Sequence, residues 1–157
     1  MAIKNKDDVI VMCEDDHCFT QDYSKKYLFY NIVEAHKQGA EILSGGIGGF
    51  GIAVPVDKNR YWVDWLWCLQ FTVIYKSFFQ KILDYQFKET DTTDGAFSFL
   101  TYNKMTIFPC ISIQKEFGYS DVTTSNNKFG QITEHFNHAN RRLSQIHEIN
   151  SHFNYKS

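Results

Sequence analysis

Short apolar runs alternate with polar segments along the chain, and their spacing predicts a mixed α/β fold. The first run, residues 9–12, is rich in β-branched residues and predicts a buried strand. Residues 22–37 predict a helix, with Gly39 placed to end it, and residues 41–43 predict a second strand. Strand, helix and strand in this order are typical of an α/β layer. The apolar positions expected to define the buried face of the helix are Tyr23, Tyr27, Tyr30 and Val33.

The rest of the chain continues the mixed pattern. Strands are expected over 52–56, 60–67, 69–75, 105–108 and 110–113, and helices over 76–83 and 96–102. A glycine-rich segment, residues 44–51, contains Gly46-x-Gly48, but no helix pattern follows it, as a dinucleotide-binding loop would require. We therefore expect a flexible loop whose backbone approaches a ligand or rearranges on binding.

The C-terminal part predicts one amphipathic helix. Residues 123–130 have the composition of a linker, which separates residues 1–122 from a helix over 131–157. Its apolar positions recur every three or four residues: Ile132, Phe136, Ala139, Leu143, Ile146, Ile149 and Phe153. Such a stripe needs a partner surface, so we expect it to pack on its own domain or to form a homodimer. Glu134 and Glu148 weaken the basic character that Arg141 and Arg142 would give a membrane-binding helix, so membrane contact is peripheral at most.

Composition narrows the class of protein. A chain of 157 residues with 43% apolar and 22% charged residues is one domain, or part of one, and globular. A net charge of −2 gives no nucleic-acid footprint. The four cysteines form no Cys-x-x-Cys pair, which favours reduced thiols over a zinc site or a disulfide framework. With no apolar signal region and no run of roughly 20 apolar residues, we expect a soluble, cytoplasmic protein.

Three consecutive carboxylates, Glu14, Asp15 and Asp16, follow the first strand. Like charges at the end of a buried strand repel one another unless something positive lies there. Mg²⁺ or Mn²⁺ suits such oxygen ligands, and in open α/β sheets ligands bind outside the carboxyl ends of strands. A solvated acidic turn is the alternative. The pair His135 and His138 could also bind metal, but a solvated helix face is the favoured interpretation.

Two further groups of residues are candidates for a site. Residues 60–67 hold all three tryptophans and one carboxylate, and they predict either a strand packing aromatic rings or a wall for an acceptor. The candidates for acceptor binding are Trp62, Asp64, Trp65 and Trp67. Asp91 and Asp94 precede the helix over 96–102; Asp91 or Thr93 is placed to cap it, with Asp94 in its first turn.

The order of these motifs resembles a known family. A strand ending in Glu-Asp-Asp, followed by a helix, resembles the metal-binding strand end of GT-A glycosyltransferases, and more narrowly of the family 25, lipopolysaccharide-type enzymes. Three later stretches are similar to that family in the same order: Phe71–Leu83, Thr93-Asp-Gly95, and Ile107–Gln114 followed by Gly118-Tyr-Ser-Asp121. The resemblance covers roughly residues 8 to 122.

The resemblance implies a partial GT-A-like, Rossmann-like mixed sheet flanked by helices. It implies transfer of a sugar from a nucleotide-sugar donor to a glycan acceptor in lipopolysaccharide or surface-polysaccharide synthesis. The protein would be cytoplasmic, with at most a peripheral contact with the inner membrane. Mn²⁺ or Mg²⁺ would be bound by Asp16, with Glu14 and Asp15. Asp94 would be the catalytic base, with Asp91 as the fallback. Gln114 and Asp121 match positions that shape the site.

One departure from the family matters. A GT-A domain normally begins with a β/α segment that holds the nucleotide base, whereas here the acidic strand starts at residue 8. The chain is therefore expected to be a fragment, to receive that half from a partner, or to have lost donor binding. Two alternatives to a transferase remain: a non-catalytic remnant that binds a glycan or a partner, and a Mg²⁺-dependent phosphate-handling enzyme unrelated to sugars.

Overall fold

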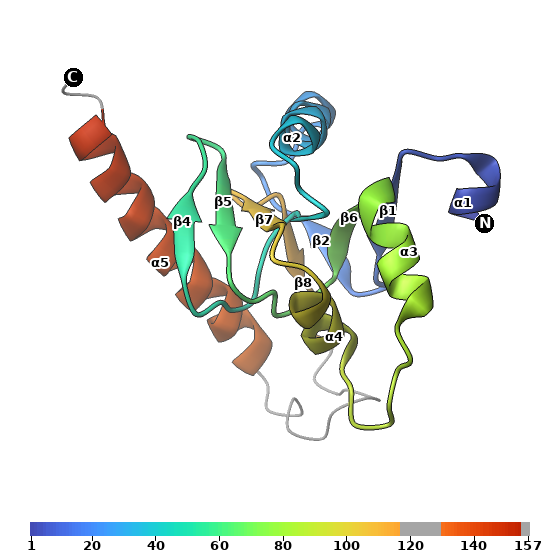
Figure 1. Ribbon diagram of the computed structural model, residues 1–157. Coiled ribbons are helices and arrows are strands. Elements are labelled where there is room, and N and C mark those ends of the chain that lie inside the picture. The colour runs from blue at the N-terminus through green and yellow to red at the C-terminus, as the bar shows by residue number, and fades with distance from the viewer. Residues whose placement is uncertain (117–129, 155–157) are drawn as a thin grey trace.

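A six-stranded mixed sheet forms the centre of the molecule (Figure 1). The computed structural model describes residues 1–116 and 130–154. The strand order is β1-β6-β3-β7-β5-β4, in which β3 and β7 are parallel and all other neighbours are antiparallel. The strands are β1 (Val9–Cys13), β3 (Ile42–Ser44), β4 (Ala53–Pro55), β5 (Arg60–Val63), β6 (Phe71–Tyr75) and β7 (Lys104–Ile107). The mixed α/β class expected from the sequence is confirmed.

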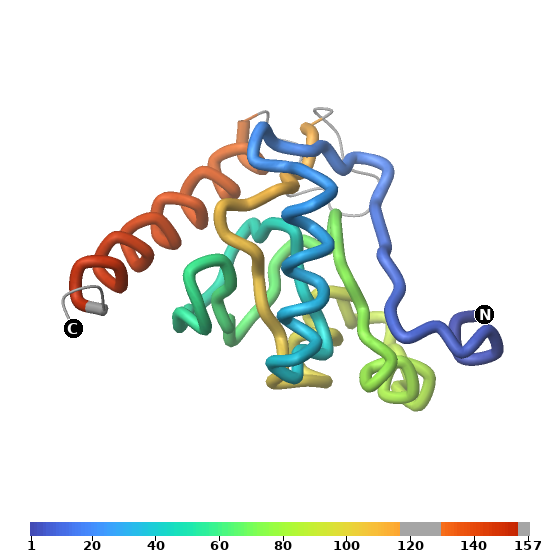
Figure 2. Tube along the Cα trace, turned by 90° about the horizontal axis from the view of Figure 1, so that it is seen from above, coloured from blue at the N-terminus to red at the C-terminus, as the bar shows by residue number. Residues whose placement is uncertain are grey.

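The inner strands bury side chains on both faces, which explains their continuous apolar runs. In β6, Phe71 and Val73 belong to one core cluster and Ile74 to the other. Helix α2 (Lys25–Lys37) covers the first cluster. Helices α3 (Lys76–Asp84), α4 (Thr93–Leu100) and α5 (Gln131–Asn154) contribute to the second. Seen from above, α2 lies over the middle of the sheet, with α5 and the N-terminus on opposite sides (Figure 2).

Helix α2 ends at Lys37 as predicted, but it begins at Lys25 and not at Asp22, and its buried face is different. The Ser24 hydroxyl accepts a hydrogen bond from the Tyr27 backbone N–H at 3.1 Å, which caps the first turn. Gly39 follows the last turn with a φ of 79°, a left-handed conformation that favours glycine. Tyr30 and Val33 are exposed, contrary to expectation. The buried positions are Leu28, Asn31 and Ala35.

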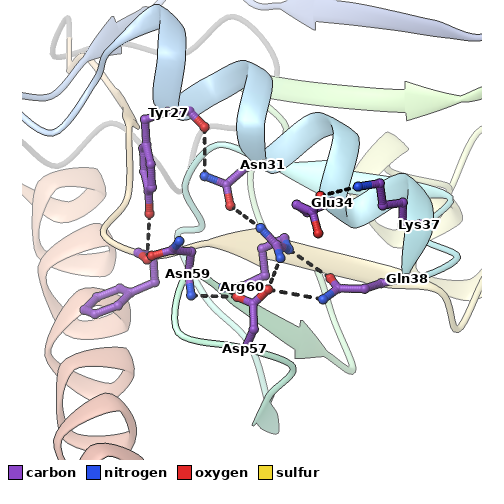
Figure 3. A network of polar contacts seen from close by, with 9 residues as sticks. Tyr27, Asn31, Glu34, Lys37, Gln38, Asp57, Asn59 and Arg60 are labelled. Atoms are coloured by element: carbon purple, nitrogen blue, oxygen red, sulfur yellow. Dashed lines mark hydrogen bonds and ion pairs between the residues drawn. The ribbon is translucent and has the colours of Figure 1, made fainter.

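A buried arginine explains why a polar residue takes part in that face. Arg60 of β5 is 0% exposed, and its guanidinium forms an ion pair with Asp57 (Figure 3). It also donates to Oδ1 of Asn31 at 2.7 Å and to Oε1 of Gln38 at 2.9 Å. Asn31 is therefore buried because it binds a cation, and the contacts join α2 to β5.

Several short elements differ from the predictions. A strand pair, β2 (His17–Phe19) with β8 (Ser112–Gln114), was not expected; residues after Pro109 leave the main sheet to form it. The strand expected over 60–67 ends at Val63, because Asp64 accepts backbone hydrogen bonds from Gly51 and Ile52 and turns the chain. A short helix, α1 (Ala2–Asn5), precedes β1.

The C-terminal helix packs on its own domain through its first half. Four of the predicted stripe positions are buried: Ile132, Phe136, Ala139 and Leu143. Ile149 and Phe153, near the other end, are exposed. Of the predicted linker over 123–130, only Gly130 lies within the described residues. Across residues 1–116 and 130–154, no helix is long and apolar enough to cross a membrane.

Candidate functional site

The acidic trio forms the turn between β1 and β2. Glu14 continues the ladder of β1, since its backbone N–H donates to the Gln70 carbonyl at 3.0 Å. The His17 N–H then donates to the Glu14 carbonyl at 3.2 Å, which closes the turn. Glu14 and Asp15 are exposed, and Asp16 is half-buried. The carboxylates therefore follow the carboxyl end of an edge strand, and those of Glu14 and Asp15 face solvent. The strand before them was expected to be buried, and this is wrong: residues 11–13 of β1 are exposed.

Asp94 joins this trio from a distant part of the chain. It lies in the first turn of α4, whose N-cap is Thr92; the Thr92 hydroxyl accepts from the Gly95 N–H at 3.2 Å. The caps expected at Asp91 or Thr93 are thus wrong, while Asp94 in the first turn is confirmed. Partial desolvation raises the pKa of Glu14, and the negative charges of Asp16, Asp94 and Asp15 raise it further. The four carboxylates therefore share one electrostatic field.

Asp16 is the carboxylate most closely held by the protein. Its Oδ2 accepts a hydrogen bond from Nε2 of Gln114, at 2.5 Å. Its Oδ1 is buried and has no hydrogen-bond partner. Desolvation raises the pKa of Asp16, and the bond from Gln114 opposes that rise by favouring the charged form. One oxygen is thus oriented by the fold, and the other is left for a ligand or water.

Cys68 lies within the field of the same acids and was not predicted as part of a site. Burial raises the pKa of its thiol to about 12, with added contributions from the charges of Asp94, Glu14 and Asp16. The thiol is therefore neutral at pH 7. Its φ is 74°, an uncommon conformation for a residue with a side chain, and such strain often marks functional segments. The spacing of Cys68 from the other cysteines does not indicate that it lies near the acids.

The glycine-rich segment is not the exposed flexible loop that its composition suggests. Residues 45–48 are buried and Gly49 is half-buried, and most of the glycines in this stretch have no room for a side chain. A β-carbon at Gly46 would lie 1.9 Å from the Ser112 carbonyl oxygen, and one at Gly48 would lie 2.7 Å from Sγ of Cys68. Close packing against the protein itself explains these glycines.

The predicted acceptor-binding residues do not form one wall. Trp62 donates from Nε1 to the Tyr102 carbonyl at 2.6 Å, and Asp64 uses Oδ1 to accept two backbone N–H groups. Trp67 packs edge-on against His135, with ring centroids 4.2 Å apart. Trp65 is 45% exposed, and its ring lies against Gly95 in the first turn of α4, the turn that also carries Asp94. Of the four residues, Trp65 is therefore the exposed one, and it packs on the helix that carries Asp94.

The remaining candidates lie apart from the acids or beyond the described residues. Asp91 accepts hydrogen bonds at Oδ2 from the Tyr85 hydroxyl and the Lys88 N–H, each at 2.9 Å. The hydrogen bond from the Lys88 N–H, and then that from the Tyr85 hydroxyl, lower the pKa of Asp91. Its charged carboxylate therefore serves to hold the loop that contains Tyr85 and Lys88. His138 is exposed on α5. Asp121 lies outside the described residues.

The acids form an open site rather than a closed cage. Among the described residues, no group of three or more His, Cys, Asp or Glu side chains has the geometry to hold a metal ion alone. Mg²⁺ commonly keeps several waters and binds through one or two carboxylates plus substrate phosphates. The arrangement of Asp16 and Glu14 is compatible with that mode.

A separate hollow of about 430 Å³ lies along α5, lined by Asn137, Asn140, Arg141, Ser144 and Gln145.

No protein-family model matches the sequence, and comparisons with curated proteins and with solved structures return no match.

Proposed function

We propose that the chain carries the metal-binding and acceptor-binding part of a GT-A-like glycosyltransferase. It transfers a sugar from a nucleotide-sugar donor to a hydroxyl group of a glycan acceptor, in the synthesis of lipopolysaccharide or another surface polysaccharide. The feature that supports this most is that the charge of Asp94, in the first turn of α4, contributes to the raised pKa of Glu14. The proposed transfer needs a basic carboxylate and a cation-binding carboxylate; Asp94 on α4 would be the first, and the acids that follow β1 would provide the second.

The acid cluster fits a divalent cation, Mn²⁺ or Mg²⁺. Oδ1 of Asp16 is buried without a partner, and neighbouring carboxylates raise the pKa of Glu14. Both observations indicate negative charge that the protein leaves uncompensated. Asp16 would be the direct ligand, with Glu14 or Asp15 beside it. A cation bound there supplies Lewis-acid stabilisation of the departing nucleotide diphosphate.

The protein groups would act on the acceptor. In an inverting transfer, the acceptor oxygen forms a bond to C1 of the donor sugar while the bond from C1 to the diphosphate oxygen breaks. The carboxylate of Asp94 takes the proton from the acceptor hydroxyl, and the electron pair of the broken bond leaves with the diphosphate. Gln114 orients Asp16 through its hydrogen bond. The neutral thiol of Cys68 adds no further negative charge to the site.

Binding of Mn²⁺ tests this proposal directly, because electron paramagnetic resonance (EPR) separates free from bound ion. The full chain is titrated with Mn²⁺ alone and with Mn²⁺ plus UDP, GDP or CMP. We expect a nucleotide to tighten Mn²⁺ binding, and Asp16→Asn to weaken it at least tenfold. Glu89→Gln removes one exposed carboxylate from the segment between α3 and α4 and is the matched control, with unchanged binding expected.

Equal Mn²⁺ affinity in Asp16→Asn and in the unmodified chain would refute the cation site. If Mn²⁺ binds but no nucleotide raises its affinity, donor binding is not a property of this chain. A phosphate-handling enzyme unrelated to sugars would instead turn over phosphoesters under the same conditions. A non-catalytic glycan-binding module is the second candidate, favoured by the exposed ring of Trp65, and it would bind a glycan with neither cation nor nucleotide.

A further inference from the structure

Three large aromatic side chains are exposed on and beside α4. Trp65 is 45% exposed, Phe99 is 77% exposed and Tyr102 is 82% exposed, whereas Phe97 on the inner side of α4 is 3% exposed. Single exposed rings are common, but neighbouring exposed rings mark interaction sites. These three residues are called the aromatic strip below.

The aromatic strip runs along α4 from its amino end to its carboxyl end. Gly95 and Phe99 are four residues apart, so they lie on one helix face about 6 Å apart along the axis. The ring of Trp65 lies against the first turn, with Cζ2 3.7 Å from where a β-carbon of Gly95 would lie. Helical side chains lean toward the amino end, which directs Phe99 toward Trp65. Tyr102 follows the end of the helix.

The surface under the strip is held in place by buried hydrogen bonds. The Ser98 hydroxyl accepts from the Leu66 N–H at 2.8 Å and donates to the Leu66 carbonyl at 3.3 Å, which fixes the segment of Trp65 to α4. Nζ of Lys104 donates to the carbonyls of Ser98 and Thr101 at 2.9 and 2.7 Å. A surface ordered before binding loses less entropy when a ligand binds.

The surroundings of the strip favour a sugar chain over a membrane. Exposed polar residues flank the two ends of α4: Thr92 and Thr93 at its amino end, and Asn103 after its carboxyl end. Flat rings can pack on the apolar face of a sugar while hydroxyl and amide groups bind its hydroxyls. An anionic membrane requires exposed basic residues. The single basic residue in 91–104 is Lys104, but it is 1% exposed and donates to protein carbonyls, so it is not available to a membrane.

We propose that the aromatic strip is an extended acceptor subsite for an oligosaccharide. Trp65 packs against the sugar unit whose hydroxyl faces Asp94, and Phe99 and Tyr102 hold units further along the same glycan. This inference rests on the proposed transferase function for its link to Asp94. The binding itself requires neither donor nor cation, so the two proposals can fail separately.

Nuclear magnetic resonance of the full chain, without metal or nucleotide, tests the strip. The probes are an array of bacterial surface oligosaccharides, the core oligosaccharide released from lipopolysaccharide, and the constituent monosaccharides. We expect saturable shifts of the Trp65 indole signal, with the Trp67 signal as an internal reference because its ring packs on His135. Affinity should rise from monosaccharide to oligosaccharide.

Phe99→Ala should weaken oligosaccharide binding about tenfold, which corresponds to about 1.4 kcal/mol. Phe153→Ala is the matched control, since Phe153 is 72% exposed on α5, and it should bind like the unmodified chain. The proposal is overturned if no probe gives a saturable shift, if monosaccharide and oligosaccharide bind equally, or if both variants behave alike. Glycan binding without Mn²⁺–nucleotide binding would support the strip and contradict the transferase.

Discussion

Gln114 donates a hydrogen bond to Oδ2 of Asp16 at 2.5 Å and so joins residues 98 positions apart. The bond exists because β2 and β8 pair next to the acidic turn, with His17 opposite Gln114. It favours the charged form of Asp16, which desolvation otherwise disfavours. Gln114 is therefore a positioning residue for the carboxylate that we propose as the cation ligand.

Gln114→Met should raise the pKa of Asp16 and weaken Mn²⁺ binding. Loss of a group that orients a metal ligand typically costs about tenfold or more in affinity. Because protons compete with the cation, the loss should be larger at pH 6 than at pH 8, which Mn²⁺ titrations by EPR at both values would measure. Gln86→Met, on an exposed loop, is the control. A loss that does not depend on pH would argue against an effect through Asp16.

Glu14→Gln should stabilise the cation-free protein at pH 7. The pKa of Glu14 is raised in the folded state, so its penalty is full above the folded pKa and vanishes below the unfolded value of about 4.3. Solvent screening limits the gain to about 0.5 kcal/mol, or roughly 1–2 °C in Tm. Thermal unfolding at pH 7 and pH 4 should show the gain at pH 7 only.

Two comparisons make the Glu14→Gln measurement specific. Glu89→Gln removes an exposed carboxylate and should leave Tm unchanged at both pH values. Asp91 has a lowered pKa, so its contribution to stability is lost as the pH falls. This pH dependence of stability is the same in every variant, so it cancels when the Tm of a variant is compared with that of the unmodified chain at the same pH. An equal gain at pH 4 and pH 7 would contradict an electrostatic origin.

Arg60→Met should destabilise the fold by about 3–5 kcal/mol, because it removes the cation paired with the half-buried Asp57 and leaves Oδ1 of the buried Asn31 without its donor. Arg60→Lys should also be destabilising, since an ammonium group cannot reproduce the planar fork that reaches three partners. Urea unfolding gives both values. The control is Arg141→Met, which removes an exposed ion pair with Glu134 and should cost at most about 1 kcal/mol.

Gly46→Ala should be more damaging than Gly39→Ala, although both replace a loop glycine. At Gly46 the new β-carbon meets the Ser112 carbonyl oxygen, and backbone cannot move aside cheaply; we expect about 3 kcal/mol or more. At Gly39 nothing lies within 4 Å, and the cost is the positive φ alone, about 1–2 kcal/mol. Chemical denaturation of both variants measures the order, and the reverse order would exclude the packing explanation.

Local sequence was sufficient where local patterns decide the structure. The runs before Glu14 and over 69–75 predicted β1 and β6, and the stripe from Ile132 to Leu143 predicted the buried side of α5. Pairing of β2 with β8 was missed because both strands are short and are brought together by distant segments. The face of α2 was misassigned because Asn31 is buried by a contact with Arg60, which no apolar periodicity can indicate.

The same limit applies to the candidate site. The sequence marks Glu14, Asp15 and Asp16, because three consecutive acids at a strand end need an explanation. That Asp94 enters their field, and that Cys68 lies there too, depends on how β1, β6 and α4 pack. The glycine-rich segment was misread because composition cannot distinguish a mobile loop from one packed too tightly for side chains.

The position of β1 has a consequence for synthesis on the ribosome. This strand is synthesised before its sheet partner β6, just as the neighbouring β2 is synthesised before β8. Val11 and Met12 are exposed even in the finished fold, so the nascent chain carries an unpaired apolar strand until β6 has been made. The three acids that follow it act as charged gatekeepers against premature aggregation, whatever they later bind.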